Sequence, residues 1–501
     1  QDMLLGVAIV DMYVKCGQLE KARQVLGEIP IENVVSSSAF VLGCVQWGKD
    51  YEEVNFIEQM HGDSISSNAG ILICFLKACG RTGAVNKGIQ IHDEIENRGL
   101  LQNDIKVGNA LMDMYAKCGM LEKAQGVLNE LLVRDRVSWN ILMSAYTQKE
   151  HYHQALDCFH RMQSEAVSPD TITFTCVLKA CGDIGAIEKG KQVHNEIVTR
   201  GLLKESIVLA TALVDMYIKC GMLSRAHQVL LDEIPFRDVV SWNVLIVGYS
   251  QQGQGNEVFD CFERMQSEGL NPDAVTFSCI LKACGNMGAI EIGKRFHTEI
   301  VNMNLLEKDI MLGNVLMDMY AKFGLLAKAH QVLENLTIRD VVSWTTIIVG
   351  YAQKGQTTEA LNCFDQMLGE CIAPNEITLL SVLAACSHSG NLDKAQMYFS
   401  DMSKKYRILP NVRHHTCMIG IYVNAGHFEK AMSVIKIMQS LDYPTVWLAL
   451  LGACQVWINE KLGRWAYEQL INLDEKCAAA YIGMGNIHAA FGVQETTHDV
   501  I

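Results

Sequence analysis

The sequence predicts an all-α fold, a right-handed α-solenoid in which short helix pairs stack into a superhelix with a concave groove. The main observation is a long repeat: related segments begin at Val34, Arg136, Val239 and Val341, so that the starts are 102, 103 and 102 residues apart. Helical spacing of the apolar residues and glycine breaks within each repeat are the other two observations. A period this regular over most of 501 residues is typical of stacked repeats and not of separate domains.

Each period contains three types of unit. First-type units begin with VSWN, second-type units carry FxxVLKACG followed by HxEI, and third-type units carry NALMDMYAKCG followed by KAxxVL. In each unit the apolar residues fall at three- and four-residue spacing in two blocks, which predicts two short amphipathic helices. One such pair cannot bury its apolar face alone, so we expect the pairs to stack and the first helix of each to line the groove.

Glycine marks the turn between the two helices of a unit because it tolerates positive φ where a helix ends. The turn glycines of the third-type and second-type units are Gly17, Gly119, Gly221 and Gly324, and Gly83, Gly185, Gly288 and Gly390. Proline marks the joints between units, and none of the seven falls inside a predicted helix, where it would be costly. These prolines are Pro30, Pro169, Pro235, Pro272, Pro374, Pro410 and Pro444.

These marks divide residues 3–442 into thirteen units. The first-type units are 34–68, 136–170, 239–273 and 341–375. The second-type units are 69–104, 171–206, 274–309 and 376–411. The third-type units are 3–33, 105–135, 207–238, 310–340 and 412–442, and unit 207–238 has one extra residue at its Leu230–Leu231 step.

Composition excludes several classes of protein. The formal net charge of −14 argues against a protein that holds nucleic acid mainly by its phosphates. We expect no membrane span, because no stretch of 18 apolar residues occurs. The sequence opens inside a repeat, so we expect that it lacks its natural start and any targeting segment. Most of the 18 cysteines lie within periodic helical segments, and we interpret them as reduced core residues.

A row of histidines invites a metal interpretation. His92, His194 and His297 each stand two residues before a glutamate, in an HxE pattern that forms half of a zinc-deaminase signature. The other half, PCxxC, is absent from the sequence, and the fourth unit of this type has Phe399 at the histidine position. We therefore interpret the row as packing and expect no metal and no cofactor. No Ser/His/Asp set or phosphate loop stands out, so we expect no enzyme acting by itself.

Two other rows have two interpretations each. Trp139, Trp242 and Trp344 could stack on bases, but each stands beside a polar position and more readily faces the core between helices. We therefore predict that they pack. A row of lysines could contact phosphate or could be solvated, and the sequence leaves both open; these are Lys117, Lys219 and Lys322.

The units resemble the pentatricopeptide repeat, and specifically the plant P-L-S class, in which long and short variants alternate. The resemblance rests on WNxLIxGYxQxG, FxxVLKACGxxGAIExGKxxH and NALMDMYAKCGxLEKA, and it covers residues 3–442. Residues 445–501 resemble the E extension that follows such arrays in organellar RNA-editing factors, through Trp447, the LLGAC segment and the segment 481–488. Some proteins of this kind continue into a cytidine deaminase domain, whose signature this sequence lacks.

The resemblance implies that the fifth and the last residue of a unit together read one base of single-stranded RNA. Short Ser or Thr at the fifth position leaves room for a purine and Asn suits a pyrimidine, whereas a terminal Asp favours a keto base and a terminal Asn an amino base. The implied pairs are Ser38 with Asn68 (A), Asn109 with Asp135 (U), Asn140 with Asp170 (U), Thr211 with Asp238 (G), Asn243 with Asp273 (U), Asn314 with Asp340 (U), Thr345 with Asn375 (A) and Thr416 with Asp442 (G). Bases would stack against the second residues Val35, Val137, Val240 and Val342.

Some units imply no base. Their fifth residues are Val7 and, in the second-type units, Ile73, Thr175, Ser278 and Leu380. The resemblance also implies an organellar location, in the mitochondrion or the chloroplast, and an N-to-C path along RNA running 5′ to 3′. The expected site is therefore 5′-A-n-U-U-n-G-U-n-U-A-n-G, with an edited C four nucleotides beyond it.

The expected function is selection of a C-to-U editing site. The deaminase would be a partner protein recruited through the E extension or a domain beyond residue 501. Two alternatives stay open: an RNA-processing, stability or translation factor that does not edit, and a protein-interaction scaffold, because α-solenoids also serve that role.

Overall fold

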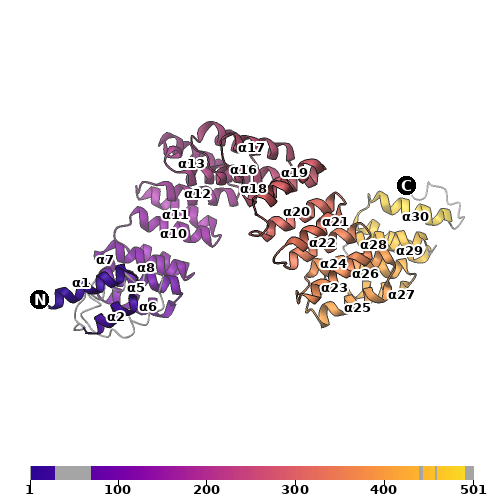
Figure 1. The fold of residues 1–501 in the computed structure, drawn as a ribbon, viewed down its shortest axis with the longest axis horizontal. Helices are drawn as coiled ribbons and strands as arrows, with labels where there is room; N and C mark the ends of the chain where they lie inside the picture. Colours follow the sequence, from indigo (N-terminus) through magenta and orange to yellow (C-terminus); the bar gives the residue numbers. More distant parts are fainter. Residues whose placement is uncertain (1, 29–68, 439–443, 457–459, 491–501) are drawn as a thin grey trace. The chain divides into compact units, whose positions relative to one another are not determined.

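The computed structural model describes residues 2–28, 69–438, 444–456 and 460–490. Within these ranges the regular structure is helical and contains no strand (Figure 1). The chain divides into two compact units, Gln1–Gly248 and Tyr249–Ile501. None of the helices in the described ranges has both the length and the apolar character needed to cross a membrane.

The helices of the first compact unit follow one another in antiparallel pairs. The helices up to Lys117 are α1 (Asp2–Lys15), α2 (Leu19–Glu28), α5 (Ala69–Thr82), α6 (Val85–Asn97), the short α7 (Leu100–Asn103) and α8 (Ile105–Lys117). Those that follow are α9 (Leu121–Glu130), α10 (Arg136–Gln148), α11 (Tyr152–Ser164), α12 (Thr171–Asp183), α13 (Ile187–Thr199), η1 (Leu202–Lys204), α14 (Ile207–Lys219), α15 (Leu223–Gln228) and η2 (Val229–Glu233).

Helix α16 (Val239–Gln251) contains the division between the two compact units. The helices after it, up to residue 404, are α17 (Gly255–Ser267), α18 (Ala274–Met287), α19 (Ile290–Asn302), α20 (Ile310–Lys322), α21 (Leu326–Asn335), α22 (Val341–Gln353), α23 (Thr357–Gly369), α24 (Glu376–Ser389) and α25 (Leu392–Lys404). The last helices are α26 (Val412–Asn424), α27 (Phe428–Ile437), α28 (Pro444–Val456), α29 (Glu460–Leu473) and α30 (Ala478–Ala490).

Within each compact unit the first helix of a pair packs against the first helix of the next pair. In the first unit α5, α8, α10, α12 and α14 form one such row, and in the second α18, α20, α22, α24 and α26 form another. The predicted tryptophans belong to the core between helices: Trp139 and Trp242 are fully buried, and Trp344 is 3% exposed. Their predicted packing role is confirmed.

Helix ends follow the expected local chemistry. All eight turn glycines have φ between 66° and 77°, the left-handed conformation in which a Cβ is strained. Helix starts are capped by the terminal Asp or Asn of the preceding unit, whose side chain accepts a backbone N–H of the first turn. At Asp135, Asp170, Asp340 and Asn375 the third helical residue returns a bond to the cap, completing a capping box.

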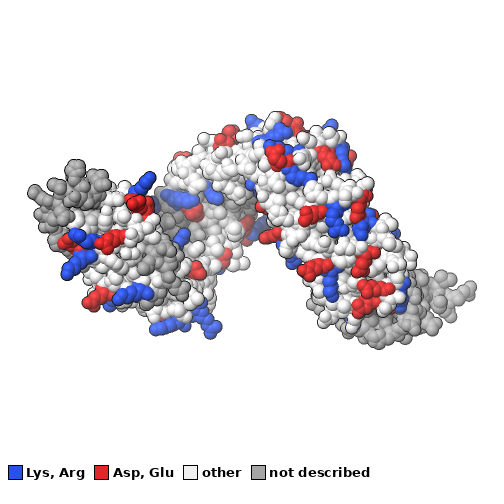
Figure 2. Space-filling view, turned by 180° about the vertical axis from the view of Figure 1, so that it is seen from behind, with Lys and Arg blue, Asp and Glu red and all other residues white. Residues whose placement is uncertain are grey.

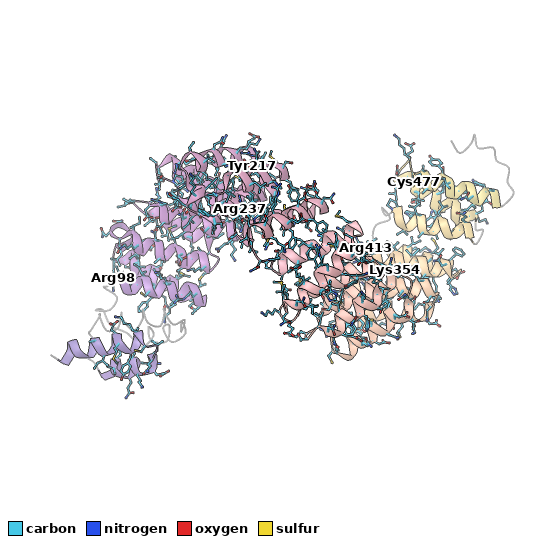
Figure 3. The ribbon with its side chains drawn as sticks, turned by 45° about the horizontal axis from the view of Figure 1, so that its top comes forward. Arg98, Tyr217, Arg237, Lys354, Arg413 and Cys477 are labelled. Atoms are coloured by element: carbon cyan, nitrogen blue, oxygen red, sulfur yellow. The ribbon has the colours of Figure 1, made fainter. Side chains whose placement is uncertain are left out.

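One outer helix is irregular. Residues Val229–Glu233 form a π-helical turn at the end of α15, which absorbs the extra residue that the sequence places at Leu230–Leu231. Arg237, which is labelled in Figure 3, closes this turn. Its Nη1 donates to the carbonyl oxygens of Leu230, Leu231 and Ile234 at 3.1–3.2 Å. The surplus residue is thus accommodated without leaving these carbonyls unpaired.

Helices α28, α29 and α30 continue the core of the array. Trp447, Leu450 and Cys454 of α28 are buried in one cluster with Ile419 and Ile435 of the preceding helices. The ring of Trp447 meets the ring of Trp465 edge to face, with the centroids 4.7 Å apart. Trp447 and the LLGAC segment therefore help to build this end of the stack.

Candidate nucleic-acid interface

Two neighbouring pockets open between first helices of the array. One, of about 330 Å³, has Val137, Asn140, Asp170 and Ile172 in its lining. The next, of about 460 Å³, is lined by Ile172, Thr175, Ser206 and Val208 among others. Apart from Asp170 and Ser206 at the joints, every lining residue of both pockets comes from a first helix, so the expectation that these helices line the groove is confirmed for this stretch.

The first pocket has a polar floor made by a predicted reading pair. Asn140 is 8% exposed, and its Nδ2 donates to Asp170 Oδ1 at 3.0 Å. Asp170 in turn caps α12, where its Oδ1 accepts the backbone N–H of Thr173 at 3.0 Å. Burial raises the pKa of the Asp170 carboxyl, but hydrogen bonds from Thr173 and Asn140 outweigh it and hold the pKa below its ordinary value.

The preceding pair is arranged in the same way. Asn109 Nδ2 donates to Asp135 Oδ1 at 3.3 Å, and Asp135 caps α10 by accepting the backbone N–H of Ser138 at 2.9 Å. Burial raises the pKa of Asp135, and the bonds from Ser138 and Asn109 again bring it below its ordinary value. In both pairs a nearly buried amide therefore donates a hydrogen bond to an ionised carboxylate that caps the next helix.

The other predicted pairs vary around this arrangement. Asn314 is 6% exposed and stands beside Asp340. Burial raises the pKa of the Asp340 carboxyl, but hydrogen bonds outweigh this effect and hold the pKa below its ordinary value. Asn314 is one of the groups that lower this pKa, but its Nδ2 and Oδ1 make no hydrogen bond of normal geometry in the described part of the chain. Thr345 is 7% exposed, and its Oγ1 lies 2.6 Å from Thr378 Oγ1 beside the cap Asn375.

The remaining predicted residues are placed less fully. Asp238 caps α16 by accepting the N–H of Ser241 at 2.8 Å, and Asp273 caps α18; Asn243 is 7% exposed. Thr211 is half-buried, and the hydroxyl of Thr416 donates to its own helix at Val412 O (2.9 Å). Some predicted residues lie outside the described residues: Ser38, Asn68, Val35 and Asp442.

In the third-type units 105–135, 207–238 and 310–340 an arginine precedes the terminal Asp. Arg134 Nε donates to Leu128 O at 2.7 Å and its Nη2 to Asn129 O at 3.0 Å, so the guanidinium caps the last turn of α9. Arg237 and Arg339 do the same at η2 and α21. An arginine fixed on one helix end and an aspartate fixed on the next helix start hold each joint in one geometry.

Exposed apolar side chains form a regular series at the second position of consecutive units. All of them are between 45% and 67% exposed, although side chains of this kind are usually buried. The series consists of Val137, Ile172, Val208, Val240, Val275, Met311, Val342 and Ile377. Val137 and Ile172 flank the first pocket, and Ile172 and Val208 flank the second.

Sequence reasoning identified only three members of this series, Val137, Val240 and Val342, within the described residues. It missed Ile172, Val208, Val275, Met311 and Ile377, which lie in second-type and third-type units. The signal was present, because each of the five is also the second residue of its unit.

The lysines left open by the sequence are paired with acidic side chains. Lys117 Nζ lies 2.7 Å from Asp113 and Lys322 Nζ lies 2.9 Å from Asp318. Lys219 contacts both Asp183 (2.8 Å) and Asp215 (3.1 Å). Basic and acidic side chains are interspersed on the face drawn in Figure 2. These lysines therefore enter any contact with phosphate already partly neutralised.

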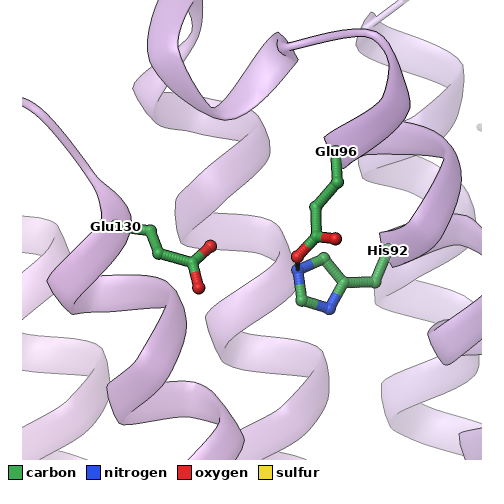
Figure 4. Close-up of side chains that lie close together, drawn as sticks. All are labelled: His92, Glu96 and Glu130. Carbon is green, nitrogen blue, oxygen red and sulfur yellow. Dashed lines mark ion pairs between the residues drawn. The ribbon is translucent and has the colours of Figure 1, made fainter.

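The histidine row connects neighbouring units. His92, His194 and His297 each place Nδ1 2.8 Å from a tyrosine hydroxyl of the next unit, at Tyr115, Tyr217 and Tyr320. His92 also lies near Glu96 and Glu130 (Figure 4), with Nε2 3.1 Å from Glu96. Because the same His–Tyr contact recurs in all three repeats, we assign the row to packing between units.

The cysteines of the described residues are free thiols. Most are buried in the helix pairs, as at Cys158, Cys261 and Cys363, where burial raises the pKa to about 12. Such thiols stay protonated and behave as small apolar core residues.

Comparison with known proteins places this geometry among repeat proteins. A model described as the PPR repeat family matches residues 134–183, 237–286 and 339–388. A second model, the PPR repeat, matches 7–34, 109–135, 172–202, 377–406 and 413–443. Both models describe a repeat and not an enzyme.

Similar proteins of known sequence come from Arabidopsis thaliana. A putative pentatricopeptide repeat-containing protein is 33% identical over 97% of this chain and 70% of its own length. A mitochondrial pentatricopeptide repeat-containing protein is 30% identical over 98% of this chain and 71% of its own length.

Solved structures share the fold. The pentatricopeptide repeat protein PPR10 from maize matches with a TM-score of 0.67 at 17% identity, covering 98% of this chain and 77% of that one. PPR10 in complex with an 18-nt psaJ RNA element matches with a TM-score of 0.70 at 15% identity, covering 100% and 83%. The all-α solenoid class predicted from the sequence is thereby confirmed.

Proposed function

We propose that this chain, which belongs to the pentatricopeptide repeat family, binds single-stranded RNA with one base in each groove pocket. The observation that carries the proposal is the alternation of exposed apolar second residues with polar pairs whose amide is nearly buried, as at Val137, Asn140, Asp170 and Ile172. A flat base needs apolar surface for its two faces and hydrogen-bonding groups for its edge. The first pocket offers both.

The polar floor suits a base that is not paired. Asn140 has a second N–H beyond the one given to Asp170. The second carboxylate oxygen of Asp170, Oδ2, lies 3.7 Å from Arg136 Nη1 and has lone pairs left to accept from a base. A donor beside an acceptor complements the C=O and N–H edge of a keto base, which a duplex would hide. This supports the implied assignment of U to the pair. The full expected site is 5′-A-n-U-U-n-G-U-n-U-A-n-G.

The acidity of the chain also fits binding through base edges. With a net charge of −14 and its third-type lysines paired to aspartates, the chain attracts phosphates only weakly, although Lys179 lines one pocket. Affinity then depends on the apolar walls and the polar floors. PPR10, whose structure with RNA shares this fold, supports the choice of RNA as the ligand.

We further propose that the array is of the P-L-S class, that residues 445–501 form an E-type extension, and that the chain selects a C-to-U editing site. The support is the alternation of unit types and the helices α28–α30 that follow the array. The deaminase would be a partner protein or a domain beyond residue 501. We place the protein in an organelle, and several similar proteins carry "mitochondrial" in their names.

Binding is tested with the expected oligonucleotide and with a version in which the central G is changed to C. The central G faces Thr211 and Asp238, and we expect the change to weaken binding about tenfold. Equal affinity for both oligonucleotides would reject base reading, and failure to bind either would favour a protein-interaction scaffold.

Editing is tested separately by sequencing organellar transcripts with and without this protein. We expect loss of C-to-U conversion at a C that lies four nucleotides beyond a match to the expected site. Unchanged conversion at every such C, together with intact RNA binding, would favour a processing, stability or translation role.

A further inference from the structure

In two reading pairs, Asn109–Asp135 and Asn140–Asp170, the amide is held by a hydroxyl that neither reading position supplies. In the pair Asn314–Asp340 the corresponding hydroxyl of Ser343 contacts Asp340 Oδ1 at 2.9 Å instead. Thr173 Oγ1 lies 2.6 Å from Asn140 Oδ1 and 3.0 Å from Asp170 Oδ1, and Ser138 Oγ lies 2.7 Å from Asn109 Oδ1 and 2.9 Å from Asp135 Oδ1. Each hydroxyl has a single hydrogen to donate, and the shorter contact is the one to the amide oxygen. Each hydroxyl belongs to the third residue of the following unit, in the first turn of the helix that the terminal Asp caps. It therefore reaches back across the joint to the unit before it.

This contact fixes the orientation of the amide. The oxygen and nitrogen of an asparagine side chain are similar in size, so half a turn of the amide exchanges donor and acceptor. At Asn140 the hydroxyl of Thr173 faces the oxygen while Asp170 faces the nitrogen, and only one orientation satisfies both contacts. The reversed amide would turn its oxygen toward a carboxylate.

Capping alone does not explain where these hydroxyls occur. After second-type units, which imply no base, the helix starts are still capped, and after the last of them Asn411 forms a capping box with His414, which has no hydroxyl. After the other three units the caps are Asp104, Ser206 and Asp309. The third residue is nevertheless apolar there, at Val107, Leu209 and Leu312. Ile71 stands at this position after unit 34–68, but after every first-type and third-type unit from 105 to 375 the third residue carries a hydroxyl. These residues are Ser138, Thr173, Ser241, Thr276, Ser343 and Thr378.

We propose that this hydroxyl is a positioning residue for base preference, so that Ser138 sets the reading of Asn109–Asp135 and Thr173 that of Asn140–Asp170. The inference rests on the proposed RNA binding. Each base is then specified by three side chains, the third contributed by the next unit. The contact of 2.6 Å between Thr378 and Thr345 extends the arrangement to a pair that contains no amide.

Ser241 provides a matched control. It stands at the same position as Ser138 and shares two of its cap contacts, since Asp238 N–H donates to its Oγ (3.0 Å) and its own N–H donates to Asp238 Oδ1 (2.8 Å). The reading residue before it is Thr211, which is too short to present an amide. Its Oγ donates to the backbone oxygen of Asp238 instead (2.8 Å). Removing this hydroxyl tests the cap without touching an amide.

The experiment measures the affinity of the full chain for oligonucleotides that differ at one base. Ser138→Ala should lower the U-over-C preference at the base of Asn109–Asp135 about five- to tenfold, and leave the preference at the base of Asn140–Asp170 unchanged. Ser138→Thr should retain the preference, because Thr173 serves the same role. Ser241→Ala should change the G-over-A preference at its base by about twofold or less. Thermal unfolding should show similar losses for the two alanine variants.

Retention of the full U-over-C preference by Ser138→Ala, or an equal loss of preference in Ser241→Ala, would show that the hydroxyl is only a cap. Those outcomes overturn this inference and leave RNA recognition intact. If the wild-type chain binds RNA without preference at either base, the proposed reading by Asn109 and Asn140 fails, and this inference fails with it.

Discussion

Two neighbouring pockets share a wall and differ in their floors. Ile172 lines both. In the pocket at Asp170 the fifth residue is an asparagine whose amide is held by an ionised cap and a hydroxyl. In the pocket at Ser206 the hydroxyl of the fifth residue, Thr175, donates to its own helix at Thr171 O (2.7 Å). Ser206 caps α14 by accepting the N–H of Leu209 at 3.3 Å.

The difference indicates that the apolar walls that would hold a base and the polar groups that would select it can vary independently in this array. The walls repeat in every unit from 136 to 411 because the second residue is apolar in each. The floor changes with unit type. We infer that the array can hold RNA along its whole length while it reads bases only in first-type and third-type units.

The largest expected effect comes from exchanging the cap of the selective pocket. In Asp170→Asn the side chain still caps α12, as Asn375 caps α24, but it no longer offers an anionic acceptor. We expect preference at that base to change from U toward C by about 10- to 100-fold, measured by competition between two oligonucleotides.

The matched change in the other pocket is Ser206→Ala. It removes a cap and no reading group, so it should lower the melting temperature and leave the choice of base there unchanged. A clear change in base preference would mean that second-type units also read.

A smaller effect, a gain of base preference, is expected when the polar residues of the pocket at Ser206 are replaced by those of the pocket at Asp170. The triple variant Thr175→Asn, Ser206→Asp and Leu209→Ser supplies the amide, the ionised cap and the hydroxyl. We expect it to acquire a preference for U over C of about tenfold at a base that wild type does not distinguish. The double variant without Leu209→Ser should acquire a weaker preference, which separates the hydroxyl from the pair. Equal preferences in the two variants would contradict the positioning role.

Lysines distinguish the two regions in a further way. Lys179 lines the pocket at Ser206, is exposed, and has no ion-pair partner among the described residues. Lys219, in the next first helix, is held by Asp183 and Asp215. We expect Lys179→Gln to reduce the slope of log affinity against log salt by about 1, equally for all RNA sequences. Lys219→Gln should leave the slope unchanged, and a similar reduction in both variants would contradict this difference.

The smallest effect near neutral pH is electrostatic. Because the pKa of Asp170 is lower in the folded chain than in the unfolded one, its ionised form stabilises the fold above the unfolded pKa of about 3.9. That contribution is lost as the pH falls through the folded pKa. We expect the difference in melting temperature between wild type and Asp170→Asn to shrink between pH 5 and pH 3, whereas Ser206→Ala should show no such trend.

The fold could be predicted from the sequence because its determinants are local and repeated. The spacing of the apolar residues predicts the helices. A glycine at the position of Gly119 or Gly185 predicts a turn in each unit, and neither prediction requires knowledge of the neighbouring units. The extra residue near Leu231 was also visible as a break in the period, but a sequence does not show whether such a residue forms a loop or a π-turn.

The candidate site was harder to predict from the sequence, for a physical reason. Asn109 and Ser138 are 29 residues apart, and their contact exists only because one unit stacks on the next. Ion pairing of Lys219 with Asp183 likewise crosses between units. Asn314 has sequence surroundings similar to those of Asn109, yet its amide makes no hydrogen bond of normal geometry in the described part of the chain. Such differences arise from side-chain orientation, which the repeat pattern does not encode.

The π-turn at Val229–Glu233 has a consequence for how such an array can change over time. An added residue in a first helix would rotate every later side chain on that helix and move its pair away from the base. Here the addition lies in an outer helix, and Arg237 still delivers Asp238 to the start of α16. An insertion in an outer helix can therefore change the length of a unit without moving the residues that we propose read the base.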